Sequence, residues 1–406
     1  MFEQRKLSQV SQVIMGQSPD GELYNTDGIG LPLITGAGQF GDVYPEPKQF
    51  SKAGSKVSKV GDIIICIRAT IGDLNWADKE YYLGRGVAAI RASKNVEPKY
   101  LWHFLKTQKN ELSRYATGST FKQIKRENIE NLPIPLPPLA EQKRIVEVLD
   151  KADALREKRR LALQKLDTLL QSVFLEMFGD SSAFPQTNLS SVCWFITKGT
   201  TPNSKEIFEN PSDNSIPFLK VYHIARDGSI DFDYKPSFVS TECHNGFLKR
   251  SKVYPGDILM NIVGPPLGKI GIVPNKYSEW NVNQALAIFR PLENSLTSWY
   301  LLYALKSMLV LQTILSQAVG IRQQNISLEQ CRNIKIPLPP IELQKKFSNI
   351  ASKIWNIKEN QSHADVQTRN LFQSLQQRAF KGELFSDEPP TVEPQEEKVW
   401  RLTSLS

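Results

Sequence analysis

An internal duplication constrains this chain more than any other feature. The octet NLPIPLPP at residues 131–138 recurs as NIKIPLPP at residues 333–340, and a Gln-Lys pair and a long helical pattern follow each copy. A long tandem repeat indicates two equivalent structural units, which an approximate two-fold axis relates if they pack together. A basic chain built in this way would suit a target made of two separated half-sites.

The two copies can be followed outside the octets. Residues 6–10 (KLSQV) match residues 188–192 (NLSSV), and residues 60–65 (VGDIII) match residues 255–260 (PGDILM). The extra residues of the second copy fall in the first part of its unit and not in the helical part. This pattern indicates one scaffold that carries two different surfaces, because function concentrates in loops on a rigid base.

Each copy has the same predicted order of elements. A Gly-Asp turn, at 61–62 and again at 256–257, precedes a short apolar run that predicts a buried strand. The other predicted elements are strands at 87–90 and 285–288 and helices near 98–115 and 297–317. Prolines exclude helix from the octets and favour rigid, extended connectors there.

The longest periodic signal follows each octet. Apolar residues spaced by three and four run from Ile145 to Met177 and again from Phe347 to Leu375, with a gap at Arg159. This spacing predicts two long helices that pack lengthwise and antiparallel against each other. The alternative is that each helix packs only on its own globular part.

Composition narrows the class of partner. The 406 residues carry a net charge of +8, with a pI of about 9.1, and such an excess of positive charge favours a polyanionic partner such as nucleic acid.

The four cysteines have no spacing typical of a zinc site, which indicates reduced thiols. The N-terminus has no apolar signal core. Residues 299–315 are the most membrane-like stretch, but Lys306 interrupts them, so they predict a buried helix.

Catalytic motifs are missing from the sequence. It contains no GxxxxGK[ST] phosphate loop, no dinucleotide fingerprint, no nucleophile elbow and no HExxH zinc motif. Asp62 and Asp257 could be imagined as nuclease carboxylates, but an Asp in a Gly-Asp turn commonly bonds the local backbone. The histidines occupy unequal places in the two copies, which argues against a duplicated active site.

Basic and amide side chains just before each octet are the candidate DNA contacts. The cations would bind phosphates, which position a protein on DNA, whereas glutamine can pair with adenine in the major groove. The candidates are Lys122, Lys125 and Arg126 in the first copy and Arg322, Gln323 and Gln324 in the second, with Arg68, Lys249 and Arg250 as weaker ones. The alternative is a solvated basic loop without a role in binding.

Together these features resemble the specificity subunits of type I restriction-modification systems. The twin stretches NLPIPLPPLAEQKRI (131–145) and NIKIPLPPIELQKKF (333–347) carry the resemblance. So do TGSTFKQIKRENI (117–129) and the closing RAFKGEL (378–384). The resemblance covers about residues 6 to 384. The second copy departs from the pattern, because it lacks the TGST loop and has Leu343 where the first copy has a glutamate.

The resemblance implies an α+β fold in which two mixed α/β target-recognition domains are separated by two long antiparallel, coiled-coil-like helices. The implied domains are residues 1–137 (first target-recognition domain), 138–180 (central spacer helix), 181–339 (second target-recognition domain) and 340–384 (distal spacer helix). Residues 385–406 form an acidic tail that is rich in Asp, Glu and Pro, and this composition predicts disorder. Each target-recognition domain would read one half of a bipartite site in double-stranded DNA. The length of the helices would set the gap between the halves.

The resemblance also implies partners. The subunit would be non-catalytic, with no cofactor or metal of its own, and would act as the scaffold for two modification subunits in a prokaryotic cytoplasm. Those subunits carry S-adenosylmethionine and methylate adenine, and two motor-nuclease subunits that use ATP and magnesium can join them. Two alternatives remain open from the residues alone: a structural adaptor without sequence-specific DNA binding, and a nuclease or methyltransferase with unrecognised motifs.

Overall fold

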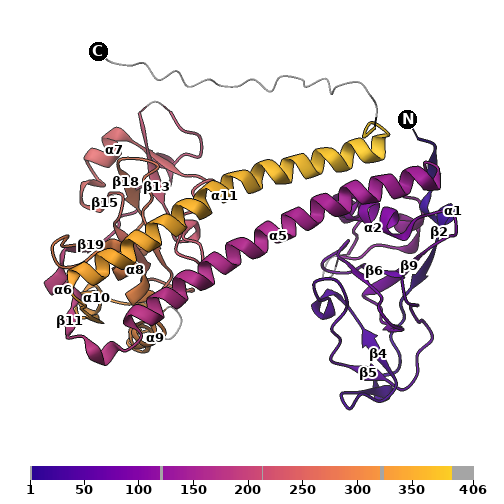
Figure 1. Ribbon diagram of the computed structural model, residues 1–406, viewed down its shortest axis with the longest axis horizontal. Coiled ribbons are helices and arrows are strands. Elements are labelled where there is room, and N and C mark those ends of the chain that lie inside the picture. The colour runs from indigo at the N-terminus through magenta and orange to yellow at the C-terminus, as the bar shows by residue number, and fades with distance from the viewer. Residues whose placement is uncertain (1, 119–121, 213, 321–323, 386–406) are drawn as a thin grey trace. The chain divides into compact units, whose positions relative to one another are not determined.

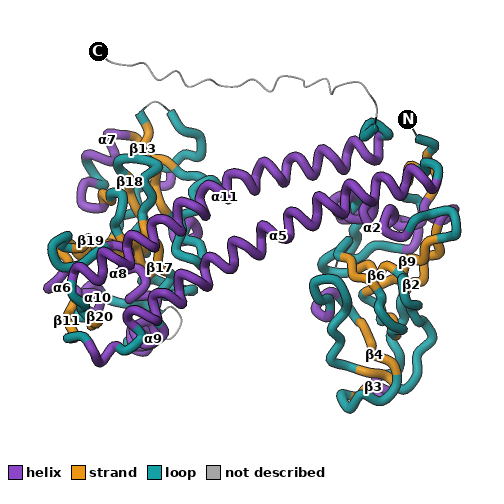
Figure 2. The backbone as a smooth tube through the Cα atoms, viewed as in Figure 1, coloured by secondary structure: helices purple, strands orange, loops and turns teal. Residues whose placement is uncertain are grey.

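The computed structural model describes residues 2–118, 122–212, 214–320 and 324–385. The chain divides into two compact units, Met1–Lys158 with Asp365–Ser406 (unit 1) and Arg159–Ala364 (unit 2). Each unit holds a globular part and one stretch of each long helix, α5 (Leu139–Phe178) and α11 (Ile341–Lys381), which Figures 1 and 2 label.

The globular part of unit 1 contains two four-stranded sheets and one two-stranded sheet. The first sheet has the order β2-β9-β6-β7 and is antiparallel, the second has the order β3-β5-β4-β8 with β4 parallel to β8, and β1 pairs with β10. The strands are β1 (Gln4–Lys6), β2 (Ser11–Met15), β3 (Tyr24–Asn25), β4 (Leu31–Ile34), β5 (Phe50–Ser51), β6 (Ile63–Cys66), β7 (Leu74–Trp76), β8 (Tyr82–Leu83), β9 (Val87–Ala92) and β10 (Pro133–Pro135). The helices are α1 (Leu7–Val10), η1 (Gly21–Leu23), η2 (Ala37–Gln39), α2 (Pro98–Thr107), α3 (Lys109–Arg114) and α4 (Arg126–Glu130).

Unit 2 repeats this plan. Its first sheet has the order β12-β19-β16-β17, its second has the order β14-β13-β18-β15 with β13 parallel to β18, and β11 pairs with β20. The strands are β11 (Gln186–Asn188), β12 (Cys193–Lys198), β13 (Ser215–Leu219), β14 (Phe238–Ser240), β15 (Lys252–Val253), β16 (Ile258–Asn261), β17 (Ile270–Ile272), β18 (Trp280–Val282), β19 (Leu286–Pro291) and β20 (Lys335–Pro337). The helices are η3 (Ser181–Ala183), α6 (Leu189–Val192), η4 (Ser204–Glu206), η5 (Val221–His223), α7 (Thr241–Asn245), η6 (Lys249–Ser251), α8 (Ser298–Lys306), α9 (Met308–Ser316) and α10 (Leu328–Arg332).

The central strand β6 is apolar throughout because both of its faces are covered. Ile63 and Ile65 share a core with Tyr100 of α2, whereas Ile64 points to the other side and packs with Leu83 of the second sheet. All four β6 residues are buried. A strand covered on both faces reads as a continuous apolar run rather than as an alternating pattern. The predicted strands at this position and at its counterpart β16 are therefore confirmed.

Each repeated octet forms a short strand, β10 or β20, and a long helix begins directly after the octet. Tyr100 donates a hydrogen bond from its hydroxyl to the carbonyl of Pro135 at 2.7 Å, and Tyr300 donates the matching bond to Pro337 at 2.6 Å. Burial raises the pKa of both tyrosines. The extended conformation predicted from the prolines is thus confirmed in β10 and β20.

A buried glutamine fixes the first turn of each long helix. In unit 1, Oε1 of Gln142 accepts a bond from the Glu97 amide at 2.9 Å, and its Nε2 donates to Asn95 and Pro137 carbonyls at 3.2 and 2.9 Å. Gln344 makes the same three contacts in unit 2, at 3.0, 3.0 and 2.9 Å, with Thr297, Ser295 and Pro339. The glutamine of the repeated motif is therefore a structural anchor between the helix and the globular part.

The two long helices contact each other within each unit. In unit 2, Phe178, the last residue of α5, has its ring centroid 5.6 Å from that of Phe347 near the start of α11. In unit 1, the Arg156 guanidinium lies 4.5 Å from the ring centroid of Phe372, in the last part of α11. The end of one helix meets the start of the other, so the predicted antiparallel packing is confirmed.

Two single-helix predictions were wrong. The segment near 98–115 forms α2 and α3, separated at Gln108, and the segment near 297–317 forms α8 and α9, separated at Ser307. Ser307 has an extended backbone (φ −60°, ψ 140°), and its hydroxyl caps the Ala304 carbonyl at 2.7 Å. Serine bonds its local backbone in this way and competes with the helix.

Within the described ranges, no single helix is long and apolar enough to cross a membrane. Only α8 and α9 taken together reach that length and composition, and they are bent by 66° at their junction.

The end of α11 leads into a short packed turn. Phe385, the first residue of the predicted disordered tail, has its ring centroid 4.1 Å from the Arg144 guanidinium and packs, partly buried, against the core of unit 1. The rest of the predicted tail, residues 386–406, lies outside the described residues.

Candidate DNA interface

The loop before each octet is a backbone hairpin with the same pairing in both units. Thr117 and Gln123 exchange backbone hydrogen bonds at 3.0 and 2.9 Å, and Val319 and Asn325 do the same at 3.0 and 2.9 Å. Both hairpins begin beside a glycine at positive φ, Gly118 (122°) or Gly320 (126°), a conformation that glycine adopts without strain.

A second segment packs beside each hairpin and places two of the predicted residues. The Ala69 amide donates to the Lys122 carbonyl at 3.2 Å, and the Gly264 amide donates to the Gln324 carbonyl at 3.0 Å. Lys122 and Gln324 therefore occupy equivalent backbone positions, and both are exposed. Arg322 and Gln323, which were also predicted as DNA contacts, lie outside the described residues.

The predicted cations Lys125 and Arg126 lie at the start of α4. Lys125 is exposed. The Arg126 guanidinium donates to the Val13 carbonyl at 2.9 Å and pairs with Glu130 at 3.2 Å, so it holds α4 against β2. In unit 2 the Arg332 guanidinium bonds the Ile196 carbonyl on the matching strand at 3.3 Å. A scaffold role for Arg126 was not apparent from the sequence.

A groove of about 800 Å³ opens beside the first hairpin in unit 1. Its lining contains Arg68 from the predicted set and Arg85, which the sequence did not single out. The lining residues are Ser18, Thr35, Gly36, Ala37, Gly38, Arg68, Ala69, Thr70, Asp73, Arg85 and Gly86. The carboxylate of Asp73 is paired with Lys109 at 2.5 Å, so within the described part of the chain Arg68 and Arg85 supply the remaining charge of the lining.

The weaker candidates Lys249 and Arg250 lie elsewhere in unit 2. Both are exposed on η6, which leads directly into β15 at the edge of the second sheet. The hairpin with Gln324 instead bonds Ile262, directly after β16 of the first sheet. These two cations thus belong to a different sheet of unit 2 from the hairpin.

Asp62 and Asp257 are structural carboxylates. Asp62 accepts the Lys59 amide at 2.7 Å and receives two bonds from Arg91, at 2.8 and 2.7 Å. Asp257 accepts the Tyr254 amide at 2.8 Å and pairs in the same bidentate way with Arg290. Burial raises the pKa of Asp257, against the opposing effect of Arg290. The predicted backbone bond is confirmed, and the arginine partners were not foreseen.

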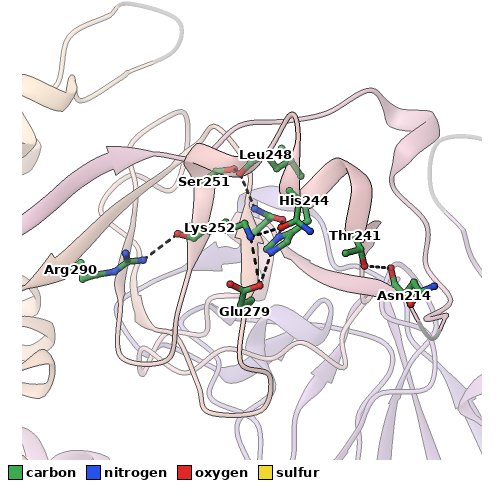
Figure 3. A network of polar contacts seen from close by, with 10 residues as sticks. Asn214, Thr241, His244, Leu248, Ser251, Lys252, Glu279 and Arg290 are labelled. Atoms are coloured by element: carbon green, nitrogen blue, oxygen red, sulfur yellow. Dashed lines mark hydrogen bonds and ion pairs between the residues drawn. The ribbon is translucent and has the colours of Figure 1, made fainter.

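A further polar network lies in the second sheet of unit 2, as Figure 3 shows. The ring of His244, 1% exposed, bonds Asn281 at 2.6 Å and Glu279 at 2.9 Å. The hydrogen bond from His244 holds the pKa of Glu279 below its ordinary value. Lys252 lies 3.7 Å from the same carboxylate. Across the described residues, no group of His, Cys, Asp and Glu side chains could hold a metal ion.

The family profile described as "Type I restriction modification DNA specificity domain" matches residues 1–165 and 186–367, one match for each copy of the repeat. The chain is 36% identical over 157 residues to a putative type I restriction enzyme specificity subunit, MjaX, of Methanocaldococcus jannaschii. That alignment spans 38% of this chain and 37% of the relative. The chain is 24% identical over 346 residues to the EcoBI specificity subunit of Escherichia coli, covering 77% of this chain and 72% of that one.

A solved structure shares the fold. The specificity subunit of a type I restriction-modification system from M. genitalium superimposes with a TM-score of 0.57 at 17% sequence identity, over 94% of this chain and 96% of that one.

Proposed function

Because this chain belongs to the family of type I restriction-modification DNA specificity proteins, we propose that each of its two units reads one half of a bipartite DNA target. The chain is the DNA-recognition subunit of such a complex and is not itself an enzyme. Its relatives are named as specificity subunits, and we assign the catalytic activities to partner subunits.

The observation that carries the proposal is one framework with two different surfaces. The hairpins, the Asp–Arg pairs and the anchoring glutamines recur with the same contacts in both units. The exposed side chains on that framework differ, since Lys122 stands where Gln324 stands in the other unit. A shared backbone with different exposed groups is what two different half-sites require, because each half-site then meets different side-chain chemistry.

We further propose that α5 and α11 bind two modification subunits and that the lengths of these helices set the gap between the half-sites. Large apolar side chains are exposed along both helices, as expected of a surface that other proteins cover. Among the described residues they are Leu139, Leu155, Leu161, Leu169 and Leu175 on α5 and Ile350, Ile357 and Leu371 on α11. S-adenosylmethionine is assigned to those modification subunits, and ATP and magnesium to motor-nuclease subunits where these join the complex. Action on DNA assigns the complex to the prokaryotic cytoplasm.

The test is a genome-wide map of methylated adenine in the host, with and without the gene for this chain. Loss of one split motif, two short half-sites around a fixed gap, is the expected result and reveals the target directly. If no motif depends on the gene, purified complexes with the modification subunits are tested for binding to a random DNA pool. Failure to enrich any split sequence there would refute the proposal and favour a structural adaptor.

A further inference from the structure

One exposed position is held by equivalent hydrogen bonds in both units and carries a different polar side chain in each. The position is Arg85 in unit 1 and Gln284 in unit 2. Arg85 lies between β8 and β9, and Gln284 lies between β18 and β19, which are the matching strands of unit 2. Both residues are exposed.

Each of these residues lies in a short connector between two strands, residues 84–86 in unit 1 and 283–285 in unit 2. Backbone hydrogen bonds fix both ends of the connector. In unit 1 the Gly16 and Gln17 amides donate to Val87 and Leu83 at 3.0 and 2.7 Å. In unit 2 the Gly199 and Thr200 amides donate to Leu286 and Val282 at 2.9 and 3.1 Å. The connector itself is tied to the second sheet, by Gly84 to Ile34 at 2.7 Å and by Asn283 to Leu219 at 3.0 Å. Arg85 and Gln284 are thus equivalent residues on equivalent backbones.

A serine or threonine hydroxyl accepts a hydrogen bond from the backbone amide of Arg85 or Gln284. The Ser18 hydroxyl faces the Arg85 amide at 3.4 Å and its Nε at 3.2 Å. The Thr201 hydroxyl accepts the Gln284 amide at 3.1 Å. The bond that Nε of Arg85 donates to the Ser18 hydroxyl also orients the guanidinium and leaves its two terminal nitrogens as donors.

Close packing of glycine keeps the connector rigid. A Cβ on Gly16 would lie 2.1 Å from the Gly84 carbonyl oxygen, and one on Gly199 would lie 2.1 Å from that of Asn283. The two backbones therefore touch directly, with no side chain between them. A rigid backbone presents a side chain at a fixed place, which reduces the entropy lost on binding.

The connector is joined to the candidate DNA hairpin in both units. The Ile67 amide donates to the Gly86 carbonyl at 2.9 Å, and the Ile124 amide donates to Ile67 at 3.1 Å. In unit 2 the Ile262 amide donates to Ala285 at 2.8 Å, and Ile326 donates to Ile262 at 2.9 Å. A residue that contacts bases from the connector would thus have the candidate DNA hairpin beside it.

We propose that Arg85 reads a guanine in one half-site and that Gln284 reads an adenine in the other. Arginine donates a pair of parallel bonds to guanine O6 and N7, and glutamine bonds adenine N6 and N7, both in the major groove. The groove beside Arg85 leaves room for a base edge, because a Cβ on Gly36 or Gly38 would meet no atom within 4 Å. This inference rests on the proposed function and names the residues that decide base identity.

The experiment exchanges the two side chains. The full chain is purified in complex with its modification subunits as wild type, Arg85→Gln and Gln284→Arg. Each complex is tested by competition binding against duplexes that carry every single-base change of the wild-type split motif. Arg85→Gln is expected to lose preference for guanine at one position of one half-site, by roughly 5- to 150-fold, and to prefer adenine there. Gln284→Arg should do the reverse in the other half-site only.

Matched controls use the same substitutions away from the connector. Arg5→Gln changes an arginine on β1, and Gln312→Arg changes an exposed glutamine on α9. Both should keep the wild-type base preferences at every position.

Two outcomes separate the inference from the proposed function. If wild type binds a split motif but Arg85→Gln weakens all duplexes equally, Arg85 binds phosphate and the inference is wrong. Unchanged base preferences in both exchanged variants would overturn it as well. If the wild-type complex selects no split motif at all, the proposed function itself fails.

Discussion

The tyrosines at equivalent positions of the two units make the same hydrogen bond, but a nearby position differs between the units. Tyr100 and Tyr300 bond the same carbonyl of the octet, but one turn later His103 stands where unit 2 has Tyr303. His103 is 1% exposed and bonds Asp150 of α5 at 2.8 Å. Burial lowers the pKa of His103, although Asp150 acts in the opposite direction. Unit 1 therefore contains a buried histidine–carboxylate contact at a position where unit 2 has a tyrosine.

The stability of unit 1 should fall as the pH is lowered through the ordinary pKa of histidine, because the unfolded chain then binds a proton that folded His103 resists. The variant His103→Gln cannot titrate and should show a shallower loss between pH 7.5 and 5.5, by at most about 1.4 kcal/mol per pH unit. Urea unfolding of the full chain at both pH values measures this. Equal losses of stability in wild type and variant would show that His103 does not contribute to the pH dependence of unfolding.

At the scale of elements, the repeated octet and its glutamine attach each long helix to its globular part. Gln142 and Gln344 are at most 1% exposed, and each satisfies one amide and two carbonyls. A buried polar group left without its partner costs its full desolvation free energy. The amide of the side chain therefore fixes the angle at which the helix leaves the octet, which no apolar residue of similar size could do.

Replacing either glutamine by alanine should destabilise its own unit. Gln142→Ala and Gln344→Ala are each expected to lower the free energy of unfolding by about 2–4 kcal/mol, since three backbone groups lose their partner. Differential scanning calorimetry of the full chain checks the loss. The exposed neighbours Lys143→Ala and Lys346→Ala serve as controls and should change stability by no more than about 0.5 kcal/mol. Glutamine variants as stable as these controls would contradict the anchoring role.

The elements that could be predicted from sequence are those set by local patterns. The Gly-Asp turns, the strands after them and the long helices follow from periodicity and from turn residues. The break at Ser307 was missed because the apolar pattern continues across it, from α8 into α9. The partners of Asp62 and Asp257 were missed because arginines distant in sequence reach them through sheet pairing.

The two copies were aligned one residue out of register at the strands β9 and β19, and this shift hid the equivalence of Arg85 and Gln284. Sequence comparison aligned Val87 with Ala285, whereas the sheets equate Val87 with Leu286, since Ile63 pairs with Ile90 and Ile258 pairs with Phe289. In a strand, a shift by one residue exchanges the two faces. Only the register of the sheets shows that Arg85 and Gln284 are equivalent positions, and local sequence similarity could not supply this.

At the scale of the whole molecule, the basic charge of +8 predicts a strong dependence of DNA binding on salt. Each phosphate contact contributes about −0.9 to the slope of log K against log salt, because bound counterions are released. Lys122→Ala should weaken binding to all duplexes alike and make the slope shallower by about 1. Fluorescence anisotropy of the complex over a salt series measures both effects.

The control for this prediction is Arg5→Ala, which removes an equal charge from β1 and should leave the slope unchanged. Binding by the wild-type complex that stays flat between low and moderate salt would contradict the assignment of the hairpin as a phosphate-binding element.

The lengths of α5 and α11 predict the gap between the two half-sites of the DNA target. Residues 159–165 of α5 and 361–367 of α11 lie between the contacts that Arg156 makes with Phe372 and Asp167 makes with Lys358. Deleting both segments removes seven residues from each helix, about 10 Å, and keeps the apolar stripe in register. The gap between half-sites should then shorten by about 3 base pairs, at about 3.4 Å each, with both half-sites unchanged.

Mapping methylated adenine in cells that express the double-deletion chain with its modification subunits measures the gap. Deletion from α5 alone is the control, because it puts the two stripes out of register and should abolish methylation rather than shift the motif. A double-deletion chain that still methylates the wild-type motif with its original gap would show that the helices do not set the spacing.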